Sequence, residues 1–69
     1  MAELITTTMK LERARRDLTQ AELADLAGVT RKSVNAIETG HMVPSIVLAL
    51  KLAQALHVKV EDLFSLAHD

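Results

Sequence analysis

The sequence predicts an all-α domain built from five short helices. The first reason is composition, because apolar residues make up 49 % of the chain, most of them Leu or Ala, and aromatic residues only 1 %. The second is that segments with apolar residues at helical spacing begin at Thr or Ser, and two of them end at Gly. At 69 residues the chain is about half an average domain. We therefore expect one domain over residues 1–69, with its core over about 9–64.

The composition also excludes several classes of protein. The chain has no Cys, which excludes a disulfide scaffold and a thiol enzyme. Its longest apolar run, Ile46–Leu50, is far shorter than the roughly 20 residues that a membrane span needs. No signal-peptide pattern opens the sequence, so we expect a cytoplasmic protein. The formal net charge is −1, so any binding to nucleic acid must depend on a local basic surface.

The chain begins with a β-branched stretch and then changes to helix formers. Residues Leu4–Thr8 show no helical period and predict a short strand or a loose tail. The residues from Met9 to Arg16 are acceptable helix formers and predict the first helix.

A second helix is expected near residues 20–27. Thr19 and Glu22 have the spacing of a capping box, in which each side chain accepts a hydrogen bond from the backbone N–H of the other residue. Gly28 marks the end of this helix, because glycine takes up the left-handed backbone without steric cost.

The third helix follows almost at once. Thr30 is a favourable N-cap, Val34 and Ile37 fall on one inward face, and Gly40 ends the segment. Only Gly28–Thr30 connects the second helix to the third. So short a connection containing glycine predicts the tight corner of a helix-turn-helix.

Pro44 and Ser45 introduce the fourth helix, with Ser45 as its N-cap. From Ile46 to Leu56 only Lys51 and Gln54 are polar. A helix that covers one side of a small core needs an apolar stripe of roughly 100°, whereas this helix is apolar over most of its circumference. Part of it must therefore face something other than the chain's own core.

A short last helix is expected over Val60–Phe64, and its first turn is acidic, as the helix dipole prefers. Residues 65–69 follow as a tail. Leu66 can pair alongside Leu4–Ile5, so residues 1–8 and 65–69 are expected to form a small two-stranded sheet or to stay as tails.

Many separated parts of this plan fall in register with one known family. They are Leu18–Ala24, Gly28–Arg31, Val34–Gly40, Val43–Ser45, Leu50–Ala53 and Val60–Phe64. Over about residues 9–64 the chain resembles the XRE family, the Cro and phage-repressor type of helix-turn-helix domain. It is most similar to the short stand-alone bacterial regulators of that family. The resemblance implies a five-helix, repressor-like DNA-binding fold.

The resemblance places the third helix in the major groove of DNA, with its first residues at the base edges. Arg31 and Lys32 can donate to guanine, Asn35 can pair with adenine, and Ala36 can touch a thymine methyl group. The alternative is that these polar residues only form the solvated face of an amphipathic helix.

Other positions of the family contact the DNA backbone. Gln20, at the start of the second helix, corresponds to a position that grips a phosphate with the help of the helix N-terminus. His41 stands where the family often has Lys or Arg, so we expect phosphate binding there to be weaker and pH-sensitive. The remaining positions that the resemblance assigns, each of which could instead be a cap or a merely exposed side chain, are Thr19, Thr30, Ser33 and Thr39.

The resemblance also implies that Arg13 and Glu38 meet as a structural ion pair that orients the first helix against the third. Because the net charge is −1, DNA binding requires that basic and acidic residues lie on different faces. The cations expected to point mainly toward DNA are Lys10, Arg13, Arg15, Arg16, Arg31 and Lys32.

Besides His41, three further positions depart from the family pattern. The family usually has Gly where His57 stands, so His57 must adopt a left-handed backbone at some cost. It has Ser or Thr where Lys59 stands, and Lys59 cannot cap the fifth helix. Position 12, which is often apolar in the family, is Glu12. The sequence therefore does not decide which face of the first helix points inward.

A second apolar surface is expected beside the core. On the fourth helix, Ile46, Ala49, Leu50 and Ala53 form the stripe that we expect to face the core. The other side is expected to form a two-fold homodimer interface, and the alternative is that its residues complete one monomeric core. These residues are Leu48, Leu52, Ala55, Val60, Leu63, Phe64 and Leu66.

These inferences favour a sequence-specific transcriptional regulator that binds a palindromic double-stranded DNA operator as a homodimer, without cofactor or metal. Catalysis is not expected. Glu38 and His41 have a spacing found in metal sites, but Gly40 ends the helix between them and no second half-motif completes the ligand set. The alternative is an antitoxin-like or other protein-binding regulator that uses the same fold to mask a partner protein.

Overall fold

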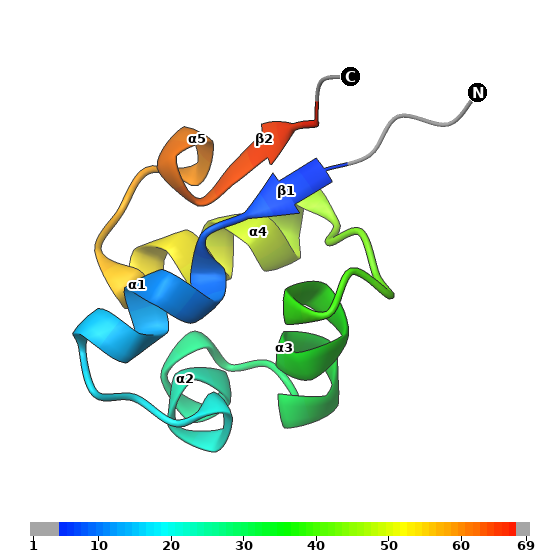
Figure 1. The fold of residues 1–69 in the computed structure, drawn as a ribbon. Coiled ribbons are helices and arrows are strands. Elements are labelled where there is room, and N and C mark those ends of the chain that lie inside the picture. Colours follow the sequence, from blue (N-terminus) through cyan, green and yellow to red (C-terminus); the bar gives the residue numbers. More distant parts are fainter. Residues whose placement is uncertain (1–4, 68–69) are drawn as a thin grey trace.

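The computed structural model describes residues 5–67, which form five helices and a small two-stranded sheet (Figure 1). In chain order the elements are β1 (Ile5–Thr7), α1 (Met9–Arg15), α2 (Gln20–Ala27), α3 (Arg31–Glu38), α4 (Ile46–Leu56), α5 (Val60–Leu63) and β2 (Phe64–Leu66). The predicted fold class and the five predicted helices are confirmed. Among the described residues, no helix combines the length and the apolar character needed to cross a membrane.

The helix boundaries follow the caps that the sequence predicts. Thr19 Oγ1 accepts from the backbone N–H of Glu22 at 3.0 Å, and the Glu22 carboxylate accepts from the N–H of Thr19 at 2.8 Å. Ser45 Oγ caps α4 by accepting from the N–H of Leu48 at 3.1 Å. Gly28 ends α2 in the left-handed region, at φ 70°. These bonds satisfy backbone N–H groups that a helix start otherwise leaves without a partner.

The sheet joins the two ends of the described chain (Figure 1), and β1 lines one pocket together with the C-terminal end of α3. Its strands are antiparallel, with Ile5 opposite Leu66 and Thr7 opposite Phe64. The predicted terminal sheet is therefore confirmed at Ile5, while Leu4 lies outside the described residues. Phe64 belongs to the strand, so α5 ends one residue earlier than the sequence predicts.

All five helices contribute to a single core. Its fully buried side chains are Met9 from α1, Leu23 from α2, Val34 from α3, Leu52 and Leu56 from α4, and Leu63 from α5. Ile37 is buried as well, as its spacing to Val34 predicts. Because α2 packs against both α3 and α4, the helix-turn-helix rests on α4.

The predicted orientation of α4 is wrong in part, because Ala49 and Ala53 are buried as expected but Ile46 and Leu50 are not. Leu52 and Leu63, expected at a dimer interface, have no exposed surface because they lie in the core. Ile46 and Leu50, expected to face the core, are 79 % and 54 % exposed. The two polar residues of α4, Lys51 and Gln54, are exposed but leave a wide apolar arc, and the packing against α2 decides which part of that arc is buried. That packing buries the side that carries Ala49, Leu52, Ala53 and Leu56.

The two expected departures at the end of α4 are present. His57 adopts the left-handed conformation at φ 57°, and Lys59 makes no side-chain cap on α5. The left-handed conformation costs an L-residue roughly 1–2 kcal/mol, and glycine avoids this cost. Glycine also gives the unfolded chain more conformational entropy, which lowers the free energy of unfolding by about 0.4–1 kcal/mol. We therefore expect His57→Gly to raise the free energy of unfolding by about 0.5–1 kcal/mol, measured by thermal unfolding. His57→Ala keeps the Cβ atom and should bring no gain; an equal gain there would trace the effect to the imidazole and not to the backbone.

Candidate nucleic-acid interface

Helix α3 presents a polar side to solvent and an apolar side to the core. Val34 and Ile37 are buried, whereas Arg31, Lys32 and Asn35 are exposed. Because residues three and four apart are neighbours on a helix surface, the three polar side chains share one face. The structure therefore brings the predicted base-reading residues together, on a helix whose rotation the core fixes. Contact of these side chains with DNA stays a prediction.

The start of α3 is held by hydrogen bonds within the chain. Thr30 Oγ1 accepts from the backbone N–H of Ser33 at 3.1 Å and donates to Ser33 Oγ at 2.9 Å. In the preceding turn the N–H of Val29 donates to the carbonyl of Ala24 at 2.9 Å. Thr30 and Ser33, both predicted to contact DNA, thus also fix the angle at which α3 leaves the turn.

Four polar side chains from three helices form one hydrogen-bonded network, which we call the α1–α3 network. Arg13 on α1 donates through Nε to Glu38 Oε2 at 2.8 Å and through Nη2 to Glu38 Oε1 at 3.1 Å. Gln20 on α2 donates through Nε2 to Glu38 Oε1 and to Asn35 Oδ1, both at 3.1 Å. The expected ion pair is present, and Gln20 connects it to a predicted base-reading residue.

The carboxylate of Glu38 is the buried centre of this network, with 3 % of its side chain exposed. Burial raises the pKa of Glu38, but hydrogen bonds from Arg13 and Gln20, together with the charges of Arg13 and Lys10, outweigh it and hold the pKa below its ordinary value of 4.5. The hydrogen bond to Glu38 raises the pKa of Arg13. Both groups are therefore charged at neutral pH and fix α1 against α3.

The C-terminal end of α3 leads to two further predicted DNA contacts, Thr39 and His41. Thr39 Oγ1 donates to the backbone carbonyl of Asn35 at 2.8 Å and lies 2.8 Å from His41 Nδ1. A hydroxyl group has a single hydrogen, so His41 Nδ1 donates to Thr39 in this arrangement. The His41 side chain is exposed.

Three of the six cations expected to point toward DNA are paired with carboxylates on the protein itself. Arg15 Nη1 lies 3.2 Å from Glu12 Oε2, and Arg16 Nη1 lies 2.9 Å from Glu12 Oε1. Arg13 is held in its own ion pair. These contacts also explain how α1 accommodates Glu12 on its buried side, because two guanidinium groups cover the carboxylate. The exposed cations of the predicted set are Lys10, Arg15, Arg31 and Lys32, and of these Arg15 pairs with Glu12.

One contact of this site has no signal in the sequence. The bond from Gln20 to Asn35 joins two helices, and neither residue's type nor its spacing signals it. The ion pairs of Glu12 do have a signal, because Arg15 and Arg16 follow it by three and four residues on a helix.

No metal site is apparent between residues 5 and 67. This part of the chain contains no group of three or more His, Cys, Asp or Glu side chains placed to hold a metal ion. Glu38, one half of the spacing considered for a metal, is bound by Arg13 and Gln20, whereas His41 contacts Thr39. Within the same described residues, every buried side-chain polar atom has a hydrogen-bond partner.

Known sequences match most of the chain. The sequence model of a family described as helix-turn-helix matches residues 9–63. YgzD, an HTH-type transcriptional regulator of Bacillus subtilis, is 47 % identical over 57 residues, which are 83 % of this chain and 86 % of that protein. An HTH-type transcriptional regulator of Methanocaldococcus jannaschii is 46 % identical over 56 residues, or 81 % of this chain and 85 % of that protein.

Solved structures match the same fold. The restriction-modification controller protein C.AhdI of Aeromonas hydrophila superposes with a TM-score of 0.75 at 35 % identity, over 78 % of this chain and 82 % of the controller. The hypothetical transcription factor NHTF from Neisseria gives a TM-score of 0.76 at 31 % identity, over 80 % of this chain and 62 % of that chain. A putative DNA-binding protein from Bacteroides fragilis, 21 % identical with a TM-score of 0.77 over 90 % of this chain and all of that chain, supports the fold alone.

Proposed function

This chain belongs to the helix-turn-helix family of transcriptional regulators, of the XRE type, and we propose that it is a sequence-specific DNA-binding regulator that reads the major groove with α3. In this proposal Arg31, Lys32 and Asn35 contact base edges. The surrounding positions that contact the backbone or a thymine methyl group are Thr19, Gln20, Thr30, Ser33, Ala36, Thr39 and His41.

The observation that carries the proposal is the way the α1–α3 network holds Asn35. Gln20 uses one lone pair of Asn35 Oδ1, which leaves the second lone pair and both amide hydrogens available to an adenine. The Asn35 side chain is thus oriented before DNA arrives, and less conformational entropy is lost on binding. A purely structural role for Asn35 would not require that it stay exposed.

We further propose that the chain binds a palindromic operator as a homodimer. One α3 reads only a few base pairs, and a two-fold dimer places a second reading helix about 34 Å away, one turn of DNA further along. The apolar side of α4 that faces solvent is compatible with such a partner.

Selection of binding sites from random duplex DNA tests both parts of the proposal. We expect enriched sequences that contain two inverted half-sites, separated centre to centre by roughly 10 base pairs. Failure to enrich any sequence would contradict sequence-specific binding. Enrichment of a single unrepeated half-site would contradict only the palindrome and the homodimer.

Gln20→Ala is expected to weaken binding to the selected operator by about 1 kcal/mol, or roughly fivefold, because the bond that orients Asn35 is lost. Titrations monitored by fluorescence anisotropy measure the affinity. Because the two residues act together, Gln20→Ala should cost less in an Asn35→Ala background than in the wild type. Equal costs in both backgrounds would show that Gln20 does not act through Asn35.

A further inference from the structure

We propose that Glu38 determines which base Asn35 reads, although only 3 % of the Glu38 side chain is exposed. It acts through Gln20, because its carboxylate fixes which way the Gln20 amide faces, and Gln20 in turn fixes the amide of Asn35. Glu38 is thus a positioning residue with a role beyond its ion pair. The inference rests on the proposed function, in which Asn35 contacts a base edge, and it names the residue that sets the specificity of that contact.

The first step of this relay is a carboxylate that can only accept hydrogen bonds. Glu38 is charged at neutral pH, and an ionised carboxylate has no hydrogen to donate. Its Oε1 accepts from Arg13 Nη2 and lies 3.1 Å from Gln20 Nε2. An oxygen of Gln20 in that place would be repelled. The NH₂ group of Gln20 must therefore face Glu38.

The second step passes this orientation to α3. Gln20 Nε2 has two hydrogens, and its two acceptors are Glu38 Oε1 and Asn35 Oδ1, each at 3.1 Å. Because Nε2 can only donate, Asn35 must turn its oxygen and not its nitrogen toward Gln20. Both hydrogens of the Gln20 amide are then used, so a phosphate contact at this position falls to the backbone N–H groups at the start of α2.

Asn35 consequently offers DNA a fixed order of donor and acceptor. Its side chain is exposed, with Oδ1 held toward Gln20. In the major groove adenine offers an acceptor beside a donor, whereas guanine offers two acceptors. An Asn with a fixed amide matches adenine and sets its oxygen against one guanine acceptor. An Asn whose amide is free to turn can donate to guanine instead, so the relay should favour adenine over guanine at one base pair.

The base preference of variants tests the relay. The base pair whose preference is lost in Asn35→Ala is the one that Asn35 reads. At that base pair we expect Glu38→Gln to lower the ratio of adenine to guanine affinity by roughly fivefold or more, because the new amide can donate or accept and leaves Gln20 free to turn. Preferences at the other base pairs should remain. Competition titrations with operators that differ only at that base pair measure the ratio.

A rescue separates the relay from a general loosening of the fold. Lys has donors only, so Gln20→Lys added to Glu38→Gln should again hold Asn35 Oδ1 and restore the adenine preference. Arg13→Lys weakens the ion pair but keeps the carboxylate, so the free energy of unfolding should fall while the adenine preference stays. Circular dichroism checks that each variant is folded.

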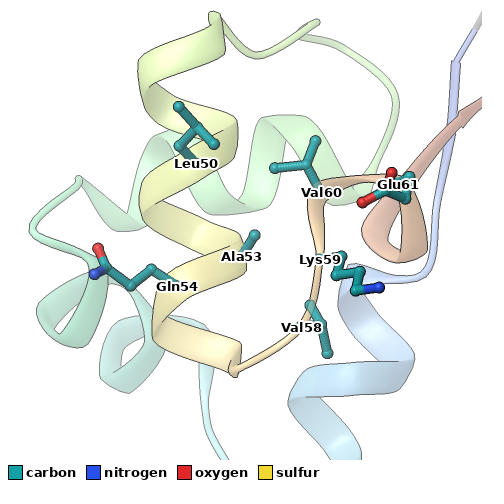
Figure 2. A pocket seen from close by; sticks show the side chains of 7 residues that line it. All are labelled: Leu50, Ala53, Gln54, Val58, Lys59, Val60 and Glu61. Carbon is teal, nitrogen blue, oxygen red and sulfur yellow. The ribbon is translucent and has the colours of Figure 1, made fainter.

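Gln20→Met tests the same relay without a change at Glu38, and it serves if Glu38→Gln does not fold. Both bonds of the Gln20 amide are removed, so the adenine preference should fall as it does in Glu38→Gln. Gln54→Met is the matched control, because Gln54 lies on α4 and lines a hollow beside α5 (Figure 2). It should leave the ratio unchanged.

The outcomes distinguish the relay from DNA reading in general. The inference is overturned if Glu38→Gln and Gln20→Met keep the full adenine preference, if Arg13→Lys loses it to the same extent, or if Gln20→Lys does not restore it. It is overturned as well if Asn35→Ala changes no base preference, while sequence-specific binding by the rest of α3 then stands. A wild-type chain without any base preference would instead contradict the proposed function, and this inference with it.

Discussion

Arg13→Ala is expected to lower the free energy of unfolding by about 3 kcal/mol, near the lower end of the range for breaking a buried ion pair. The substitution leaves the enclosed Glu38 carboxylate without its cation. It also removes the bond from Arg13 Nη1 to the carbonyl of Leu18, 2.8 Å long, so α1 loses its links to α3 and to the α1–α2 connection. Domains of this size are commonly stable by roughly 3–10 kcal/mol, so the loss would remove much of the total stability.

Chemical unfolding followed by circular dichroism measures this loss. Arg15→Ala is the matched control, because Arg15 also lies on α1 and pairs with a carboxylate, but 62 % of its side chain is exposed. An exposed pair contributes little, so the control should change the free energy of unfolding by no more than about 0.5–1 kcal/mol. Equal losses in the two variants would show that enclosure of the Arg13–Glu38 pair has no special importance for stability.

The pH dependence of this loss has a definite direction. In the wild type the pKa of Glu38 is lowered, so its stabilising contribution is complete above the ordinary value of 4.5 and disappears as the pH falls further. In the Arg13→Ala variant the guanidinium no longer balances the burial of Glu38. We therefore expect the pKa of Glu38 to rise and its charged carboxylate to destabilise the fold at neutral pH. The difference in stability between the two proteins should therefore shrink as the pH is lowered toward and below 4.5. A constant difference would indicate lost packing instead of lost charge pairing.

The elements of this fold could be predicted because their signals are local. The Thr19–Glu22 capping box, the Ser45 cap and Gly28 each act within one turn of helix. The structure places both ends of α2 and the start of α4 at these residues. The rotation of α4 could not be predicted in the same way. It depends on which apolar side best fits α2, and that choice involves residues distant in sequence.

The same distinction applies to the candidate site. The exposed positions of Arg31, Lys32 and Asn35 follow from the buried spacing of Val34 and Ile37, which any reader of the sequence can see. By contrast, Arg13 and Glu38 are 25 residues apart, and only the resemblance to a family suggested that they meet. Long-range polar pairs have no periodic signature, because their geometry is set by the packing of whole helices.

Arg31→Ala and Lys32→Ala are each expected to weaken binding to the selected operator by about 1–3 kcal/mol, a factor of roughly 5 to 150 in Kd. Both side chains are exposed at the N-terminal end of α3, where bidentate contacts with guanine are possible. Binding to random DNA should weaken much less, since a base contact contributes only at the correct base pair. Competition titrations with operator and random duplexes measure the two affinities side by side.

The salt dependence of binding separates base reading from simple loss of charge. Removing a phosphate contact lowers the slope of log Kd against log salt by about 1 and weakens all sequences alike. Removing a base contact relaxes the preference at one base pair while that slope changes less. Lys51→Ala is the matched control, because it deletes one exposed cation on α4, away from α3, and should leave operator preference unchanged. If Arg31→Ala and Lys32→Ala behave like this control, the outer face of α3 does not read DNA, and the exposed polar side chains there serve only solubility.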